Sequence, residues 1–271
     1  MNPVSLGLFL AITSKLPQSL LLTGAKGVGL STIAKYIASL SNLNPIIVLP
    51  MKDEKIDIEK GVIGVDIMRR LYDETRTKTV ERRIIIIDYA QRMTIQSQNA
   101  FLKLLEEPGE NVYFILVSHS TTKLLPTILS RVAMLGIKPI TYDQTSQLLD
   151  SLGVTDDKKR SQLLFMALGL PAELTNLVND NDYFEKRRLM VQDARELLRA
   201  NLYDKLLIAQ RYKDNRESVL LLLLDVANIL QKSIIDKPRA DTINHINKLL
   251  KTYQRIEANG NIRICLAQMI F

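Results

Sequence analysis

Residues 23–32 have the composition of a loop that binds phosphate. They follow a short apolar run, 20–22, and lead into a helical pattern. A glycine-rich turn from a strand into a helix points its backbone N–H groups at one spot, where they can bind phosphate oxygens. The spacing is that of a P-loop, with Ser31 at the position of the hydroxyl that binds Mg²⁺. The candidate nucleotide-binding residues of this loop are Gly24, Lys26, Gly27, Gly29, Ser31 and Thr32.

Leu30 occupies the position at which a P-loop has the lysine that reaches the β and γ phosphates. The substitution removes a charged contact that is typically worth about 1.5–3 kcal/mol. Lys26 lies too early in the turn to be a simple replacement, although its flexible side chain could still approach a phosphate. We therefore expect a loop that descends from a P-loop and does not hydrolyse nucleotide by itself. An ATPase in which Lys26 substitutes for the missing lysine is the alternative.

A single carboxylate follows another apolar run. Residues 84–87 are four isoleucines, and Asp88 comes after them, at the edge where open parallel sheets bind ligands. Asp88 is thus placed to hold Mg²⁺, directly or through water. A hydrolytic site usually has a second acid next in the chain, but here that residue is Tyr89, which is not a base at neutral pH. The other interpretation of Asp88 is a helix cap or an internal ion pair.

Short apolar runs alternate with helical patterns in the first half of the chain. Four runs predict strands that are buried on both faces: 20–22, 46–49, 84–87 and 112–117. Helical patterns lie between them, near residues 30–40, 65–77 and 95–106. Strands separated by helices form right-handed βαβ units, so the predicted fold of this half is α/β with a mainly parallel sheet.

From about residue 140 onward the patterns are helical. The polar run 179–182 has the composition of a linker between a small helical bundle and the long amphipathic helices that follow. The predicted organisation is an α/β domain at 1–140, a small helical domain at 141–180 and a second helical domain at 181–271. The predicted fold class is therefore α/β followed by all-α.

Composition narrows the classes of protein to which the chain can belong. With 271 residues, of which 46% are hydrophobic and 24% charged, it suits a globular protein of about two domains. The net charge of +7 permits a polyanionic partner without requiring one. Cys265 is the only cysteine, and His119 and His245 lack ligand spacing, so we expect no zinc and no other metal site. The apolar runs are far shorter than the roughly 20 residues that cross a bilayer, which predicts a cytoplasmic protein without membrane contact.

Residues 84–132 are similar to one family of proteins over their whole length. The segment reads DYA at 88–90, SQNAFLKLLEEP at 97–108 and ILSRV at 128–132. The succession of an asparagine–alanine pair, LEEP and a serine–arginine pair is specific to clamp loaders. The chain thus resembles the AAA+ clamp-loader subunits of DNA polymerase III. The resemblance covers about residues 1–180 well, and the C-terminal third only by helical pattern and length.

The resemblance implies a fold and a set of site residues. The fold would be an AAA+ sheet domain with a degenerate P-loop, a small helical lid and a C-terminal collar that holds subunits together. Arg131, preceded by Ser130, would act in trans at the ATP site of a neighbouring subunit, where a guanidinium stabilises charge on the transferring phosphate. Glu173 stands where ATPase members of the family have an arginine that senses nucleotide. His119 falls near the family's first sensor position, and we expect it to be structural.

The resemblance further implies a non-hydrolysing clamp-loader subunit rather than an enzyme that is active in isolation. Its partners would be the gamma and tau ATPase subunits, the delta subunit and the sliding clamp, with primed DNA met through the assembled complex at the bacterial replication fork. No cofactor would be required, and ATP with Mg²⁺ in the chain's own altered loop is left open. A DNA-binding adaptor is a further alternative. Against it, several basic residues alternate with acids, as on a solvated helix face: Lys186, Arg187, Arg188, Arg195 and Arg199.

Overall fold

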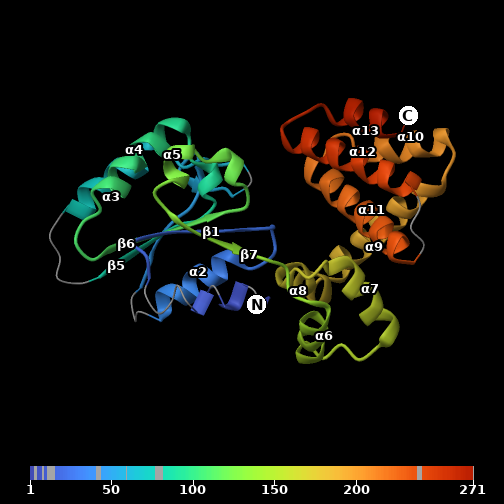
Figure 1. Cartoon of the computed structure of the whole chain (residues 1–271), viewed down its shortest axis with the longest axis horizontal. Helices are drawn as coiled ribbons and strands as arrows, with labels where there is room; N and C mark the ends of the chain where they lie inside the picture. The colour runs from blue at the N-terminus through green and yellow to red at the C-terminus, as the bar shows by residue number, and fades with distance from the viewer. Residues whose placement is uncertain are drawn as a thin grey trace. The chain divides into compact units, whose positions relative to one another are not determined.

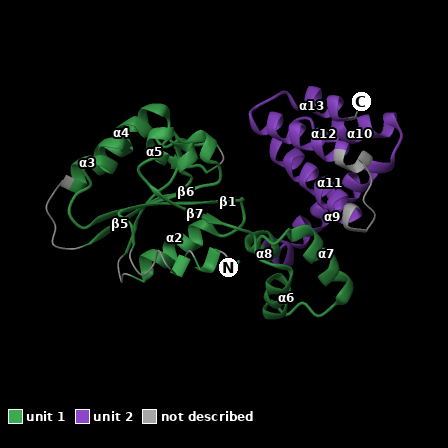
Figure 2. Ribbon diagram, viewed as in Figure 1, with its two compact units in different colours: residues 1–175 green, residues 176–271 purple. Residues whose placement is uncertain are grey.

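A computed structural model gives the arrangement of the chain (Figure 1). It describes all residues except 3–4, 8, 11–15, 41–43, 59, 77–81, 237–239 and 271. The described residues form two compact units, Met1–Thr175 and Asn176–Phe271 (Figure 2). The finer division of the first unit, into a sheet domain ending at 140 and a separate lid, stays a prediction.

A five-stranded sheet forms the centre of the first unit. Its strands lie in the order β2, β5, β6, β1, β7, and every neighbouring pair is parallel. The α/β class with a parallel sheet is thus confirmed. The strands are β1 (Ser19–Gly24), β2 (Ile46–Val48), β5 (Arg83–Ile87), β6 (Val112–Ser118) and β7 (Ala133–Ile137).

Helices cover both faces of this sheet (Figure 1). Leu21 packs in the core that β1 shares with α3, α4 and α5, whereas its neighbours Leu20 and Leu22 pack in a second core with α2. Successive side chains of a strand point to opposite faces, so a strand covered on both faces is apolar throughout. This explains the unbroken apolar runs of the central strands. The helices are α2 (Leu30–Ser39), α3 (Val65–Arg76), α4 (Ile95–Glu106) and α5 (Pro126–Leu129).

Two strand features were not predicted from the sequence. The edge strand β7 has only two buried side chains, Leu135 and Ile137, so it lacks the apolar run that marked the other strands. The short antiparallel pair of β3 (Met51–Lys52) and β4 (Lys55–Ile56) is exposed at three of its four residues. Sparse burial therefore accounts for both omissions.

Three helices follow the sheet: α6 (Tyr142–Ser151), α7 (Asp157–Ala167) and α8 (Pro171–Asn179). Gly169 lies in the turn between α7 and α8 with a φ of +73°. Its carbonyl accepts a hydrogen bond from the Ile140 N–H at 2.8 Å. A Cβ at position 169 would lie 2.5 Å from the Ile140 carbonyl oxygen, so this position requires glycine. The chain thus enters α6 and leaves α7 at the same point.

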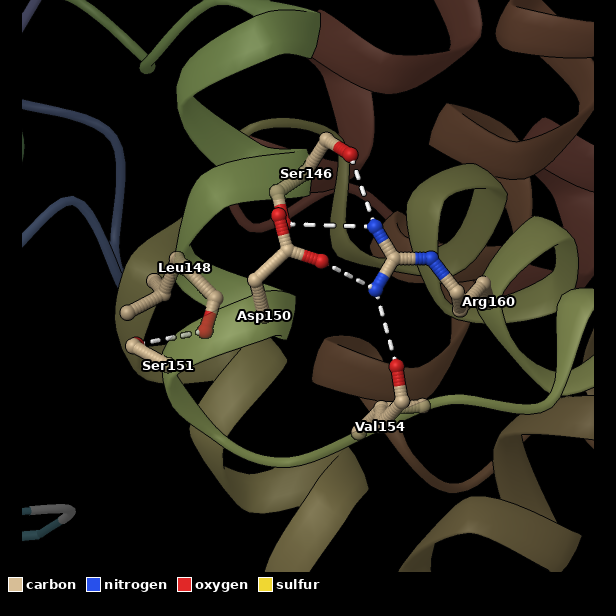
Figure 3. A network of polar contacts seen from close by, with 6 residues as sticks. All are labelled: Ser146, Leu148, Asp150, Ser151, Val154 and Arg160. Atoms are coloured by element: carbon tan, nitrogen blue, oxygen red, sulfur yellow. Dashed lines mark hydrogen bonds and ion pairs between the residues drawn. The ribbon is translucent and has the colours of Figure 1, made fainter.

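Arg160 joins α7 to α6 (Figure 3). Its Nη1 lies 2.7 Å from Asp150 Oδ1 and donates to the Val154 carbonyl at 2.8 Å. Its Nη2 donates to Ser146 Oγ, also at 2.8 Å. The arginine side chain is only 18% exposed, and charge-assisted bonds of this length are among the stronger ones in proteins. Arg160 therefore fixes α6 and α7 to each other as one hairpin.

The second unit is helical in its described part, as predicted. Its core surrounds α11, where Val219, Leu222 and Leu223 are fully buried. Asp180 caps α9 by accepting the Tyr183 N–H at 2.9 Å, so the polar run 179–182 joins two helices directly instead of forming a linker. Among the described helices, none combines the length and the apolar composition that a bilayer crossing needs. The helices are α9 (Asn181–Arg199), α10 (Leu202–Arg211), α11 (Arg216–Asp236), α12 (Ala240–Glu257) and α13 (Ile262–Ile270).

A buried ion pair ties α9 to α11. Arg187 Nη1 and Nη2 lie 2.7 Å and 3.1 Å from the two carboxylate oxygens of Asp225. The two side chains are 3% and 0% exposed. A bidentate pair of this kind satisfies both charges in a place where water cannot.

Candidate functional site

The predicted phosphate loop connects the C-terminal end of β1 to the start of α2. Gly24 ends the strand, and a Cβ there would lie 2.5 Å from the Ile137 carbonyl oxygen of β7. Gly29, with a φ of +94°, is the N-cap of α2 and has open space where a side chain would be. Both glycines are therefore required by the backbone, and the loop ends at a helix N-terminus of the kind that binds anions.

The side chains of the loop differ from those of a hydrolytic site. Leu30, in the position of the P-loop lysine, is 1% exposed and packs in the core with Ala34 and Ile37. The Lys26 side chain is exposed, as is Thr32, and Ser31 is half-buried. The start of α2 therefore presents no cation of its own to a phosphate.

Three strand ends meet beside this loop. Because β5, β6 and β1 are neighbours in a parallel sheet, Asp88, His119 and Gly24 come together at its C-terminal edge. Asp88 is buried, with 6% exposure, and its Oδ1 accepts the Tyr89 N–H at 3.0 Å. Tyr89 has a left-handed backbone with a φ of 55°, and its ring meets that of His119 edge-on at 5.7 Å. The position of the missing second acid is thus occupied by an aromatic contact.

His119 joins β6 to the other two strand ends. Its Nδ1 lies 3.2 Å from the Gly24 carbonyl, which can only accept, so Nδ1 carries the proton. Its backbone N–H donates to Gln91 Oε1 at 3.3 Å. Burial lowers the pKa of His119 from its ordinary value of 6.5, and the Lys26 charge acts in the same direction, while the Gly24 bond and Asp88 oppose the shift. These contacts suit the structural role expected for His119.

The start of α8 lies against the phosphate loop. The Ala172 N–H donates to the Gly27 carbonyl at 3.0 Å. A Cβ built on Gly27 would lie 3.5 Å from Leu170 Cβ and 3.8 Å from the Glu173 backbone nitrogen. Glu173 therefore stands beside the loop, where its sequence position had placed it, with an acidic side chain.

These residues do not fit a site that hydrolyses Mg²⁺–ATP. The loop keeps the backbone of a phosphate cradle, but Leu30 supplies no cation and Tyr89 supplies no base. The start of α8 also occupies the Gly27 carbonyl and packs Leu170 against that glycine. We therefore derive no reaction step from a nucleotide in this loop.

Arg131 lies at the opposite edge of the sheet from the phosphate loop. Parallel pairing aligns Leu20 of β1 with Ala133 and Gly24 with Ile137, so Arg131 precedes the N-terminal end of β7. Four residues of strand separate the two edges by roughly 13 Å. The structure thus brings together the predicted loop residues and Asp88, but it places Ser130 and Arg131 elsewhere, and both are exposed.

The Arg131 side chain is held by residues on two helices. Its Nη1 donates to the Thr127 carbonyl at 3.0 Å and to Ser130 Oγ at 3.4 Å. Its Nη2 lies 2.8 Å from Oε1 of Glu106, the last residue of α4. Ser130 Oγ itself donates to the Thr127 carbonyl at 3.0 Å, so the serine supports the turn before the arginine.

Gln98 connects α4 to the segment that carries Arg131, a role that the sequence did not reveal. Its side chain is 3% exposed. Its Nε2 donates to the carbonyls of Lys123 at 3.0 Å and Met93 at 3.3 Å, and its Oε1 accepts the Leu125 N–H at 2.8 Å. One signal was available, because Gln98 falls three residues before Phe101 on the apolar stripe of α4. A polar residue on a buried face must find partners.

Comparisons with known proteins give relatives from one functional group. The family described as DNA polymerase III, delta subunit, matches residues 42–141. Replication factor C subunit 4 of Encephalitozoon cuniculi is 31% identical over 62% of this chain and 52% of its own length. The gamma subunit of DNA polymerase III from Buchnera aphidicola is 26% identical over 84% of this chain and 68% of its own. The delta′ subunit from Haemophilus influenzae is 31% identical over 40% of this chain and 34% of its own.

The chain thus spans about half of the Encephalitozoon relative and a third of the Haemophilus one. Among solved structures, a point mutant of RuvB from Thermotoga maritima is similar with a TM-score of 0.51 and 15% identity. The similarity covers 72% of this chain and 74% of that one. At this identity the likeness shows the fold alone, which is the AAA+ arrangement of an α/β sheet domain followed by helices.

Proposed function

Because the chain belongs to the DNA polymerase III clamp-loader family, we propose that it is a subunit of the delta′ type that does not hydrolyse ATP itself. In this proposal Arg131 enters the ATP site of a neighbouring ATPase subunit during loading of the sliding clamp. Planar, permanently charged guanidinium groups are suited to stabilise the charge of a transferring phosphoryl group from outside the site that binds it.

One observation carries the proposal. Arg131 is exposed, preorganised and at the sheet edge opposite the phosphate loop, whereas Leu30, in the place of the P-loop lysine, is buried in the core. An arginine in that position cannot serve the chain's own loop, so the anion that it meets must belong to another subunit. The chain's own loop, without a lysine and without a second acid, is then a structural remnant that needs neither ATP nor Mg²⁺.

The relatives suggest the partners. Gamma and tau subunits of several bacteria match this chain, and we propose that subunits of that kind provide the neighbouring ATP site. The delta subunit, the sliding clamp and primed DNA would be met in the same assembly. The helices from α9 to α13 would join the collar that holds the subunits together.

The test is ATP hydrolysis by the purified chain, alone and then with the motor subunits, delta subunit, clamp and primed DNA of the same source. We expect no turnover by the chain alone. In the mixture the chain should raise turnover and clamp loading, and Arg131→Ala should abolish this increase. Arg69→Ala is the matched control, because Arg69 is an exposed arginine of the same unit, 72% exposed and ion-paired with Asp66.

Other results would favour the alternatives. Turnover by the isolated chain that is lost in Lys26→Ala would identify an ATPase with an unorthodox phosphate site. Tight DNA binding by the isolated chain, falling steeply with salt, would identify a DNA-binding adaptor. Full stimulated ATPase with Arg131→Ala would refute the role of Arg131 in trans.

A further inference from the structure

We infer that Glu106 is a positioning residue for Arg131, holding its guanidinium in the orientation in which it meets the phosphate of the neighbouring subunit. The inference rests on the proposed function of Arg131. It starts from the 2.8 Å contact between Arg131 Nη2 and Glu106 Oε1, which joins the end of α4 to the turn after α5. These two helices are neighbours in the fold (Figure 1).

The backbones on both sides of this contact are fixed. The Arg131 N–H donates to the Ile128 carbonyl at 2.9 Å, and Ile128 is fully buried in the core above the sheet. Leu105, the neighbour of Glu106, packs in the same core. Gln98 adds hydrogen bonds from α4 to the chain just before α5. The distance between the two charged side chains is therefore set by rigid elements rather than by a mobile loop.

The contacts of Arg131 leave part of its guanidinium available. A guanidinium has five N–H groups. Two on Nη1 are directed at Thr127 and Ser130, and one on Nη2 at Glu106. Within the described contacts this leaves the Nε hydrogen and the second Nη2 hydrogen for an incoming anion. Arg131 can therefore meet a phosphate without first releasing Glu106.

Stability alone does not explain this ion pair. The side chains are 38% and 52% exposed, and ion pairs exposed to that degree contribute little to folding. Their value lies in limiting the rotamers of a long side chain that must act at one place. A group held in its reacting geometry avoids losing this entropy when the transition state forms. The negative charge of Glu106 also approaches the phosphate, and we infer that the gain in orientation outweighs this repulsion.

The test uses the reconstituted complex and the part of its ATPase that Arg131→Ala removes. Glu106→Gln should reduce that part by about two- to fivefold in kcat, the size expected for an exposed ion pair, with KM for ATP nearly unchanged. Glu106→Asp, which keeps the charge, should recover some of the loss. Glu106→Gln combined with Arg131→Ala should be no worse than Arg131→Ala alone, because the carboxylate acts only through the arginine.

Glu107→Gln is the matched control. Glu107 is the next residue, is also exposed, and makes no contact with Arg131 in the described part of the chain. It should leave the rate unchanged, and thermal unfolding should show that all variants fold alike. An unchanged or faster rate with Glu106→Gln, while Arg131→Ala is still defective, would overturn the positioning role alone. An unaffected Arg131→Ala complex would instead overturn the proposed function.

Discussion

The buried ion pair of the second unit gives a sharp test of how its helices are held. Asp225→Asn keeps the size of the side chain but removes its charge, so the Arg187 guanidinium stays buried without its counter-charge. The two contacts of 2.7 Å and 3.1 Å and the exposures of 3% and 0% place the pair out of water. At such separations, a loss of about 3–5 kcal/mol of unfolding free energy is expected.

Glu185→Gln makes the same chemical change in an exposed pair on the same helix. Arg188 Nε lies 2.8 Å from Glu185 Oε2, and these side chains are 45% and 48% exposed. The expected loss there is below about 1 kcal/mol. Urea unfolding of the intact chain would give the free energies, and amide hydrogen exchange would localise the loss to α9 and α11. Equal effects of the two substitutions would refute the reasoning from burial.

Two further predictions concern the first unit. Gln98→Ala removes three hydrogen bonds and strands buried backbone groups of Met93, Lys123 and Leu125, so unfolding free energy should fall by about 2–4 kcal/mol in thermal or urea unfolding, more than for Gln96→Ala, an exposed glutamine of α4. His119 has a lowered pKa when folded, so below its ordinary pKa of 6.5 the unfolded chain binds more protons and stability falls with decreasing pH. His119→Asn should remove this component, and a wild-type stability that is equal at pH 7.5 and pH 5.5, or an NMR titration of His119 centred above 6.5, would contradict it.

The central strands could be predicted because burial on both faces leaves one pattern. The run 84–87 can only be a covered strand, and the structure places β5 there with four buried isoleucines. The edge strand β7 buries two side chains of five, which is too few to distinguish it from a loop. Prediction of strands from one sequence therefore fails where the sheet itself is only partly covered.

The candidate site divides in a similar way. Residues close in sequence, such as Gly24, Gly29 and Leu30, could be assigned because a local turn brings them together. The meeting of Asp88 with His119 followed from parallel strands that end at one edge. The contact between Glu106 and Arg131 joins residues 25 positions apart through the packing of α4 and α5, and no local pattern encodes it. What the sequence lacked was the register between elements.

The hydrogen bond between Ile140 and Gly169 bears on how this protein can vary among organisms. A hairpin whose two ends meet at one point is an insertion in the geometric sense, because the chain on either side is already joined. The entropy of closing such a segment grows only slowly with its length. Residues can therefore be added to or removed from the α6–α7 connection while α8 keeps its place on the phosphate loop. Changes of chain length in evolution should gather there, and they should be rare at Gly169, where a side chain has no room.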